Sequence, residues 1–314
     1  MTHTVVPRDG CRGSDKQECS HRDRECGMKV HHLNCISTCP LCGKLFNGHP
    51  DSLIRRGHLT CHCLLVESPA GLVLVDTGFG LRDVADPYSR LGKFFLRLLK
   101  PEFRNEMTAI RQIERLGFDP ADVRHIVMTH LDSDHAGGLD DFPHATVHML
   151  ASERQYAAQQ KTWLDRQRFR PQQWSYQNMW RVHSPQYTER WEGFAKVHPI
   201  EELASEIALV PLRGHTYGHA GVAVHGDGGW LLLAGDAYFD SGELDPVRPH
   251  CAPGLRFYQC MLEKDRAARL YNQRRLRDLA KRASPALTIF CSHDVDEFER
   301  LAGRSVAVPA EQMA

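Results

Sequence analysis

The sequence predicts an α/β fold whose strands deliver polar residues to one edge of packed sheets. Short apolar runs rich in Val, Leu and Ile recur in both halves of the chain, and amphipathic segments follow them. Candidate functional residues come just after such runs or at glycine turns, namely Asp76, the segment 130–135, His215, Asp236 and His293. Because strand ends that share one edge of a sheet lie close together, we expect these residues to meet in space.

Periodicity and turn residues locate the individual elements. Strands are expected at 28–33, 61–67, 72–75, 126–128, 146–150, 207–212, 221–225, 230–233 and 286–291, and those at 61–67 and 72–75 are expected to form a hairpin. Helices are expected at 88–100, 107–116 and 261–282, the second of them closed by Gly117. Strands thus occur throughout both halves of the chain, with helices after them.

Composition divides the chain into a folded part and two weakly patterned ends. Residues 1–27 are polar and predict a disordered extension, 28–304 predict one domain, and 305–314 predict a tail. The stretch 151–199 differs in texture and is expected to be a helical insertion that forms a lid or a homodimer contact. Nucleic-acid stacking is the alternative interpretation, because four of the five tryptophans lie here among arginines: Trp163, Trp174, Trp180 and Trp191.

Net charge and cysteine usage exclude several classes of partner. Lys plus Arg and Asp plus Glu are both 39 in 314 residues, so no bulk charge attracts nucleic acid or an anionic membrane. No run is long enough to cross a bilayer, and the first residues lack the apolar core of a secretory signal. Eleven cysteines are an odd number in a chain too large to need disulfides. We therefore expect a cytoplasmic protein with reduced thiols and a small-molecule substrate.

The densest group of candidate ligands is the segment 130–135, which directly follows the apolar run 126–128. It offers His130, Asp132, Asp134 and His135. Two imidazoles and two carboxylates form a mixed nitrogen and oxygen set, which suits Zn, Fe or Mn better than Ca or Mg. A solvated loop with incidental histidines is the alternative. Distant residues of the right types favour the metal site.

Two further groups of residues have a structural and a functional interpretation. Asp76 opens a glycine turn at a strand tip, so it either caps that turn or orients a metal-bound histidine. The cysteines invite a structural zinc site, or they are simply small buried residues. The cysteines concerned are Cys35, Cys39, Cys42, Cys61 and Cys63.

The whole arrangement resembles the metallo-β-lactamase superfamily over about residues 28–300. In that family one strand ends in His-x-His-x-Asp-His, and later turns and strand ends supply His, Asp and His. The matching residues are His130, Asp134, His135, His215 in Arg-Gly-His, Asp236 in Leu-Ala-Gly-Asp, and His293 in Phe-Cys-Ser-His-Asp. The Val-Asp-Thr-Gly of 75–78 and the Ala-Gly-Gly of 136–138 also match. The resemblance implies an αββα sandwich with the site at one edge of its two sheets.

The resemblance also implies two divalent metal ions. One ion is assigned to His130, Asp132 and His215, the other to Asp134, His135 and His293, and Asp236 bridges them. Asp132 departs from the motif, because the family has its second histidine at this position. Zinc is the expected metal, and the hard oxygen of Asp132 makes Fe or Mn an alternative.

The chemistry that the resemblance implies is hydrolysis of a small ester or lactone by a metal-bridging hydroxide. Asp134 is expected to accept a proton. The chain looks most like the N-acyl-homoserine lactonases, in which a tyrosine three residues after the bridging Asp assists the substrate carbonyl. Phe239 occupies that place here, so Tyr238, one residue earlier, is the candidate for this role.

Other functions remain open from the sequence. A thioesterase, a phosphodiesterase and an iron-dependent oxidoreductase would share the fold and the ligand set. A binding module that keeps its metals only for structure is a further alternative. A structural site would not need a bridging carboxylate and open coordination positions, so hydrolysis is favoured.

Overall fold

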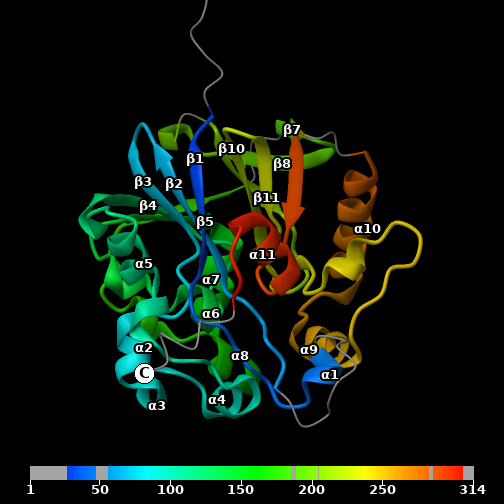
Figure 1. The fold of residues 1–314 in the computed structure, drawn as a ribbon, viewed down its shortest axis with the longest axis horizontal. Helices are drawn as coiled ribbons and strands as arrows, with labels where there is room; N and C mark the ends of the chain where they lie inside the picture. The colour runs from blue at the N-terminus through cyan, green and yellow to red at the C-terminus, as the bar shows by residue number, and fades with distance from the viewer. Residues whose placement is uncertain (1–26, 47–55, 185–188, 204, 283–285, 307–314) are drawn as a thin grey trace, which may run out of the picture.

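Two six-stranded sheets lie face to face with helices on both outer sides, in the predicted αββα order (Figure 1). The computed structural model describes residues 27–46, 56–184, 189–203, 205–282 and 286–306. The predicted extension at 1–27 and the predicted tail at 305–314 lie almost wholly outside the described residues. None of the described helices is long and apolar enough to span a membrane.

The first sheet comes from the N-terminal half of the chain. In order it contains β1 (Lys29–Asn34), β2 (His62–Ser68), β3 (Gly71–Val75), β4 (Val123–Val127), β5 (Thr146–Leu150) and β6 (Trp180–His183). β1, β2 and β3 pair antiparallel, with β2 and β3 forming the predicted hairpin, whereas β3 to β6 are parallel. Since β3 and β4 run in the same direction, Asp76 and the segment 130–135 emerge at the same edge.

The second sheet comes from the C-terminal half. Its order is β12 (Leu287–Phe290), β11 (Gly229–Leu233), β10 (Ala220–Gly226), β9 (Ile207–Pro211), β8 (Phe194–Pro199) and β7 (Glu189–Trp191). β11 and β12 are parallel and the other neighbours are antiparallel. β9, β11 and β12 therefore share one direction. Their carboxyl ends bring His215, Asp236 and His293 to one edge.

A continuous apolar layer between the sheets holds the two halves together. Leu64 and Val73 of the first sheet belong to the same buried cluster as Leu209 and Val222 of the second, and all are fully buried. Each such side chain contributes roughly 1.5–3 kcal/mol when it leaves water. The strands that carry them are buried on both faces, which explains why they read as near-continuous apolar runs.

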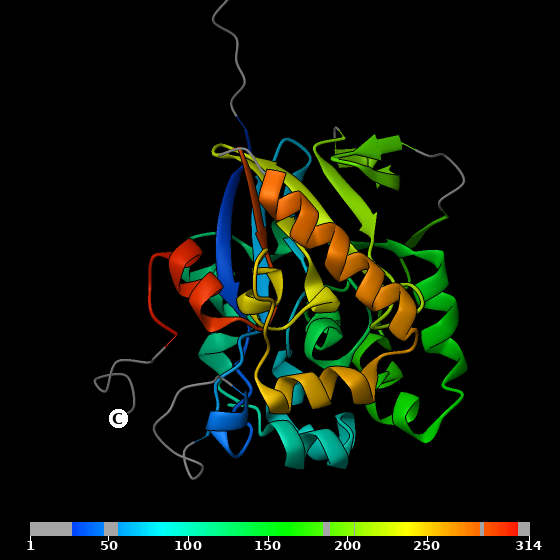
Figure 2. The same ribbon diagram turned by 90° about the vertical axis from the view of Figure 1, so that its right-hand side faces the viewer.

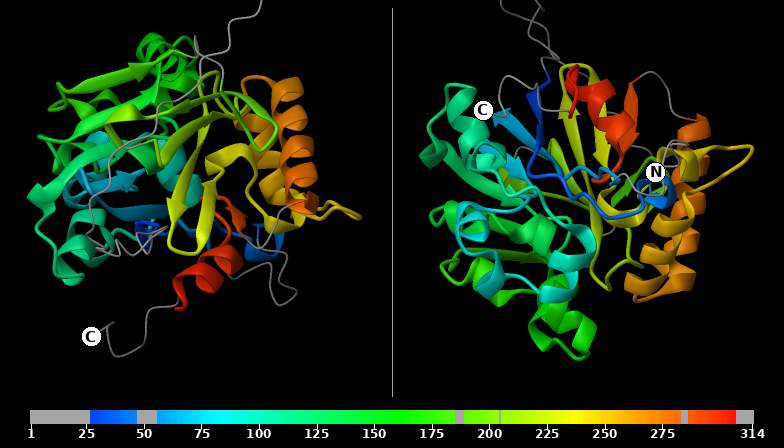
Figure 3. Two further views of the ribbon diagram at one scale, coloured as in Figure 1. Left: turned by 90° about the horizontal axis from the view of Figure 1, so that it is seen from above. Right: turned by 60° about the horizontal axis from the view of Figure 1, so that its bottom comes forward.

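Helices cover the outer face of each sheet. α5 (Ala109–Arg115) and α7 (Ala151–Gln159) pack on the first sheet, and α10 (Arg266–Arg282) packs on the second. Figure 2 shows α10 running across the face of its sheet, and both views in Figure 3 place it on the flank opposite α5. The other helices are α1 (Gly43–Phe46), α2 (Leu81–Ala85), α3 (Pro87–Arg90), α4 (Lys93–Leu99), α6 (Ser133–Ala136), α8 (Trp163–Arg168), α9 (Pro253–Leu262) and α11 (Val295–Ala302).

Two predicted helices are interrupted for reasons that lie in distant residues. The helix expected at 88–100 is broken into α3 and α4 by Gly92, which passes so close to α8 that a Cβ there would lie 2.7 Å from the Gln167 carbonyl oxygen. The helix expected at 261–282 is broken between α9 and α10. The N–H groups of Lys264 and Asp265 instead donate to the carbonyl of Gly214, at 2.8 and 3.0 Å.

The expectation of a helical insertion at 151–199 is only partly correct. Its first part forms α7 and α8, but 180–199 contributes β6, β7 and β8 to the two sheets. β6 pairs parallel with β5, and β8 pairs antiparallel with β9. Strands near a sheet edge need little apolar alternation of their own, which is why the sequence pattern of this segment is irregular.

A row of histidines lies across the first sheet and reaches the second. His125 Nδ1 lies 3.0 Å from His148 Nε2, and His148 Nδ1 lies 3.0 Å from His183 Nε2. The ring centroid of His183 is 4.5 Å from that of His198, on β8. Burial first, and then the neighbouring His183 and His125, lower the pKa of His148 to about 3. Burial and His198 lower the pKa of His183 to about 4. The folded protein therefore holds His148 and His183 neutral at mildly acidic pH.

We expect the free energy of unfolding to fall as the pH drops from about 6.5 towards 4. The unfolded chain, with histidine pKa near 6.5, binds protons in this window that His148 and His183 of the folded protein do not. One group such as His148 costs on the order of 1–2 kcal/mol between pH 6.5 and 5. In urea unfolding at several pH values, His148→Gln should show a weaker pH dependence, and the exposed His144→Gln should not. Equal slopes for His148→Gln and the wild type would contradict this.

Candidate metal centre

The carboxylate of Asp236 is the point on which four imidazole rings converge. Its Oδ1 lies 3.2 Å from Nε2 of His135 and 3.2 Å from Nε2 of His293. Its Oδ2 lies 3.3 Å from Nε2 of His215 and 3.7 Å from Nε2 of His130. All five side chains are buried. The structure thus brings together residues from strand ends of both sheets, as the sequence predicts.

Asp236 separates two sets of candidate ligands. The first cluster consists of His130, Asp132 and His215, which with Asp236 offer ligand atoms within 4.8 Å of one another. The second cluster consists of Asp134, His135 and His293. Within it His135 and His293 group with Asp236 at the same limit, and Asp134 Oδ2 lies 3.8 Å from His293 Nε2.

Asp76 and Thr129 orient the histidines that follow β4. Asp76 Oδ2 lies 2.8 Å from His135 Nδ1, so the ring turns its Nε2 towards Asp236. The same carboxylate accepts from the backbone N–H and the hydroxyl of Thr129, at 2.8 and 2.7 Å, and that hydroxyl lies 2.9 Å from His130 Nδ1. Of the two interpretations of Asp76, the structure therefore favours the one in which Asp76 orients a histidine. Such outer contacts fix the tautomer and direction of a metal-binding ring.

Backbone carbonyls and a further histidine complete the orientation on the second sheet. His293 Nδ1 lies 2.7 Å from the carbonyl oxygen of Thr60, which leaves its Nε2 facing Asp236. His219 Nε2 accepts from the backbone N–H of Asp236 at 2.9 Å. Gly235 allows this approach, because its φ is +57° and a Cβ there would lie 2.6 Å from that nitrogen. His219 therefore positions Asp236 through the backbone, and it is not among the converging rings.

The hydrogen bonding and charge of the second cluster suit a divalent cation. His135 Nε2 and Asp236 Oδ1 are buried and have no hydrogen-bond partner within the described residues. Burial would lower the pKa of His135, but Asp236 and Asp76 raise it well above its ordinary value. Burial opposes ionisation of Asp236, but the surrounding histidines hold the pKa of its carboxyl well below the usual range. The pocket therefore attracts positive charge, which a metal ion supplies.

The cysteines do not assemble into the structural zinc site that their spacing suggested. Within the described residues, no group able to hold a metal contains two of the five cysteines. Cys61 instead lies with Asp134 and His293, at the second cluster, and Cys39 lies with His58 and Glu102. Cys61 is therefore the one cysteine of the five placed beside the predicted site residues.

Arg168, at the end of α8, enters the first cluster and was not among the predicted site residues. Its Nε and Nη2 donate to Asp132 Oδ1 and Oδ2, at 2.7 and 2.5 Å. Nη2 also lies 2.8 Å from His215 Nε2. Burial opposes the charge of Asp132, but Arg168 holds the pKa of that carboxyl well below its ordinary value. The available signal was Asp132 itself, because an extra buried carboxylate requires a cationic partner.

The tyrosine predicted to be catalytic is not directed at the cluster. Tyr238 is fully buried on the outer side of the second sheet, and its hydroxyl donates to Glu297 Oε1 at 2.9 Å. Phe239 faces the cluster instead, with its ring centroid 5.0 Å from that of His293. Tyr258, on α9, stacks near Phe239 at 5.8 Å. Burial, and next the carboxylates of Asp134, Asp132 and Asp236, raise its pKa well above the ordinary value. Tyr258 therefore lies near the candidate ligands.

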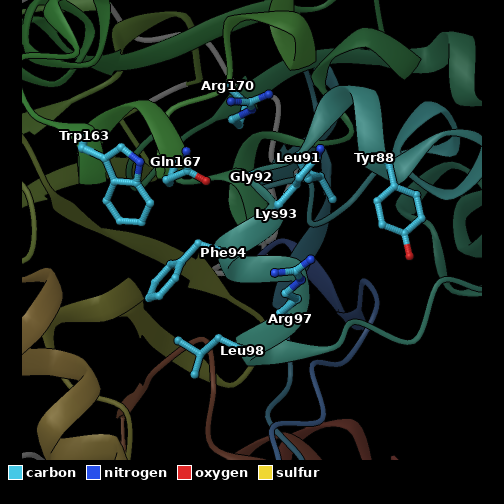
Figure 4. A pocket seen from close by; sticks show the side chains of 10 residues that line it. All are labelled: Tyr88, Leu91, Gly92, Lys93, Phe94, Arg97, Leu98, Trp163, Gln167 and Arg170. Carbon is cyan, nitrogen blue, oxygen red and sulfur yellow. The ribbon is translucent and has the colours of Figure 1, made fainter.

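Two cavities adjoin this region. A small cavity of about 70 Å³ reaches His293. Apolar side chains such as Phe239 and acidic ones such as Asp240, Asp294 and Asp296 line it. A larger cavity of about 780 Å³ lies between α4 and α8, lined by Phe94, Trp163 and several basic side chains (Figure 4). None of the predicted site residues lines the larger cavity. It is separated from the cluster by α8, where Gln167 faces the cavity and the next residue contacts Asp132.

Comparison with known proteins gives concordant results. The family model of the metallo-beta-lactamase superfamily matches residues 56–293. The probable metallo-hydrolases Rv2300c of Mycobacterium tuberculosis and Mb2322c of Mycobacterium bovis are 41% identical over 272 residues, 87% of this chain and 82% of theirs. An N-acyl homoserine lactonase of Bacillus thuringiensis is 23% identical over 245 residues, 76% of this chain and 83% of its own. A solved N-acyl homoserine lactone hydrolase, with N-hexanoyl-L-homoserine at its catalytic metal centre, matches with a TM-score of 0.64 and 20% identity over 88% of this chain and 96% of that one.

The chain therefore belongs to the metallo-beta-lactamase superfamily, and the predicted fold class is confirmed. The predicted enzyme is supported at the level of a metallo-hydrolase with a His and Asp metal site. The likeness to the solved lactonase, at 20% identity, concerns the fold.

Asp76→Asn should weaken metal binding by roughly 10- to 100-fold, because the neutral amide no longer holds His135 in the ligating tautomer as strongly. Competition of the purified protein with a zinc-binding dye measures this affinity. Asp278→Asn, an exposed carboxylate on α10, is the matched control and should leave the affinity unchanged. Similar affinities for Asp76→Asn and the control would show that Asp76 does not support the ligand.

Tyr258→Phe should lower kcat for any substrate that the protein hydrolyses by about 10-fold or more, because a hydroxyl near the reacting groups is lost. Tyr238→Phe is the control, since it loses only the bond to Glu297. It should lower the free energy of unfolding by about 1–3 kcal/mol and leave kcat largely unchanged. A loss of kcat confined to Tyr238→Phe would reverse this assignment.

Proposed function

We propose that this protein is a metal-dependent hydrolase of esters, and that its substrates are lactones or other small acyl esters. The observation that carries the proposal is the convergence of four imidazoles on the buried carboxylate of Asp236, next to an apolar wall. The lactone hydrolase with a similar fold holds its ring-opened product at its catalytic metal centre, which supports the same class of substrate here.

A divalent ion held by Asp134, His135, His293 and Asp236 would polarise a carbonyl oxygen and lower the pKa of water. The chain itself supplies the proton acceptor. Asp134 keeps 13% of its side chain exposed, against 4% for Asp236, so it is the carboxylate of the centre that solvent and substrate reach. Tyr258 supplies a hydroxyl from the facing helix.

The surroundings of the second cluster favour an acyl group over a phosphodiester. Phe239 packs with Phe46, Leu59 and Leu255 into an apolar cluster beside His293. Its ring shields the centre from water, which strengthens electrostatic interactions within it. A phosphodiester would leave its charged oxygen against these carbons, whereas an acyl chain buries apolar surface there.

Zinc is the metal that we propose for the second cluster. Cys61 adds a sulfur atom to the imidazole and carboxylate groups around His293. Zinc accepts nitrogen, oxygen and sulfur ligands, whereas magnesium and calcium prefer oxygen. The family resemblance implies two ions, but the proposed reaction depends on the ion of the second cluster.

Hydrolysis of an acyl-homoserine lactone should exceed that of an acyl-glutathione and of a bis-aryl phosphodiester when the protein is loaded with Zn, Mn or Fe. His135→Ala and Asp236→Ala should reduce both bound metal and turnover, by more than the roughly 10- to 100-fold expected for outer-shell partners. Metal analysis and initial rates measure the two effects. Full metal and activity in these variants would refute the proposal, and preference for either other substrate would change the substrate class.

A further inference from the structure

The guanidinium of Arg168 is held by contacts on three of its nitrogens. Nε and Nη2 form a two-point pair with the carboxylate of Asp132, the geometry in which arginine binds carboxylates most specifically. Nη1 donates to the carbonyl oxygen of Leu262 at 2.7 Å. Leu262 is the last residue of α9, where helix carbonyls lack partners within the helix and the dipole favours a cation. These contacts form a built site for a guanidinium.

We propose that Arg168 is the permanent cation of the first cluster and that the protein binds one divalent ion, in the second cluster. This inference rests on the proposed metal-dependent function and specifies how many ions that function uses. It also changes the interpretation of Asp132, which stands where the family has a histidine. The carboxylate binds an arginine and is not there to favour iron or manganese.

The ligand atoms of the first cluster are already engaged by Arg168. An ion there would need to lie about 2.0–2.2 Å from Asp132 Oδ2 and His215 Nε2. Arg168 Nη2 lies 2.5 and 2.8 Å from these same two atoms. A metal ion at that point would overlap the nitrogen and meet its positive charge. The guanidinium cannot lose its proton to relieve the repulsion.

Arg168 cannot easily withdraw from this position. The main chain of its neighbour Phe169 forms an antiparallel bridge with Asp132, which fixes the spacing of the two segments. The side chain is 2% exposed, and Phe169 beside it is fully buried. Moving the guanidinium would leave a buried cation without its carboxylate, which is strongly unfavourable.

The second cluster differs in this respect. Asp236 Oδ1 has only long contacts, at 3.2 Å, to the rings of His135 and His293, and no hydrogen bond within the described residues. The ion pairs of Asp134 and Asp236 in the described part of the chain are with histidines, not with arginine or lysine. His130 Nε2 has no hydrogen-bond partner in the described part of the chain, and it lies 3.5 Å from Asp132 Oδ2 and 3.7 Å from Asp236 Oδ2. One ion beside Asp236 therefore satisfies the atoms that Arg168 does not reach.

The number of ions in the full-length wild-type protein tests this inference. The protein is loaded with excess Zn²⁺, freed of unbound metal by gel filtration and analysed for zinc per chain. We expect one ion, and the manganese-loaded protein should give the paramagnetic resonance spectrum of isolated Mn²⁺. Two tightly bound ions, or an exchange-coupled manganese pair, would overturn the inference and leave the proposed function intact. No bound ion would refute both.

Variants give a second readout. Asp132→His/Arg168→Ala removes the guanidinium and restores the family's histidine, so the zinc content should rise from one ion to two. Arg168→Gln should also admit a second ion, at Asp132 and His215. Arg166→Gln, on the exposed side of the same helix, is the matched control and should retain one. Retention of one ion by folded Arg168→Gln and by the folded double variant would contradict the inference. If neither variant folds, the wild-type count still decides it.

Discussion

A buried carboxylate that must be neutralised is the constraint on which this structure depends. Asp236 lies where the two sheets meet and is almost fully shielded from water. An unpaired anion in such a place would be strongly destabilising. The four imidazoles around it come from loops of both sheets. The contacts behind them, from Asp76, Thr129 and Thr60, each turn a ring nitrogen towards the same point. The two sheets therefore position one buried carboxylate and the imidazoles that surround it.

Many of these strands and loops could be predicted from the sequence, because the residues that indicate each of them are close together in the chain. An apolar run followed by His or Asp predicts both a strand and the loop after it. This pattern predicted the positions of Asp76, the segment 130–135 and His293. The direction of parallel strands then predicts that these loops share an edge. The hairpin of β2 and β3 could also be predicted, because its turn and its apolar runs lie within a few residues of one another.

The parts that could not be predicted depend on contacts between distant segments. Arg168 lies 36 residues from Asp132 in a stretch without regular apolar spacing, so nothing in its own neighbourhood indicates its direction. Tyr258 lies on α9, and the chain turns after this helix to bond with Gly214, a residue distant in sequence. Tyr238 adjoins the family's tyrosine position, but a shift of one residue after a strand points a side chain to the opposite face.

The pairing of Asp132 with Arg168 also shows how a fold can be kept while its charges are redistributed. The substituted carboxylate adds one negative charge to the centre, and an arginine from another segment adds one positive charge. The two charges cancel, so this pair of side chains adds no net charge to the centre. The positive charge of Arg168 is permanent, because a side chain cannot exchange with solvent as a bound metal ion can.

The bond between His293 and Thr60 joins residues 233 positions apart, and neighbouring backbone bonds join β2 to the loop after β12. A contact of such high sequence separation closes a very long loop, which costs conformational entropy and is associated with slow folding. During synthesis the segment 130–135 leaves the ribosome well before His293 exists. The complete set of ligands forms only when the two halves dock, because Asp236 and His293 follow strands of the second sheet. The metal site and the interface between the two sheets therefore depend on the same long-range contacts.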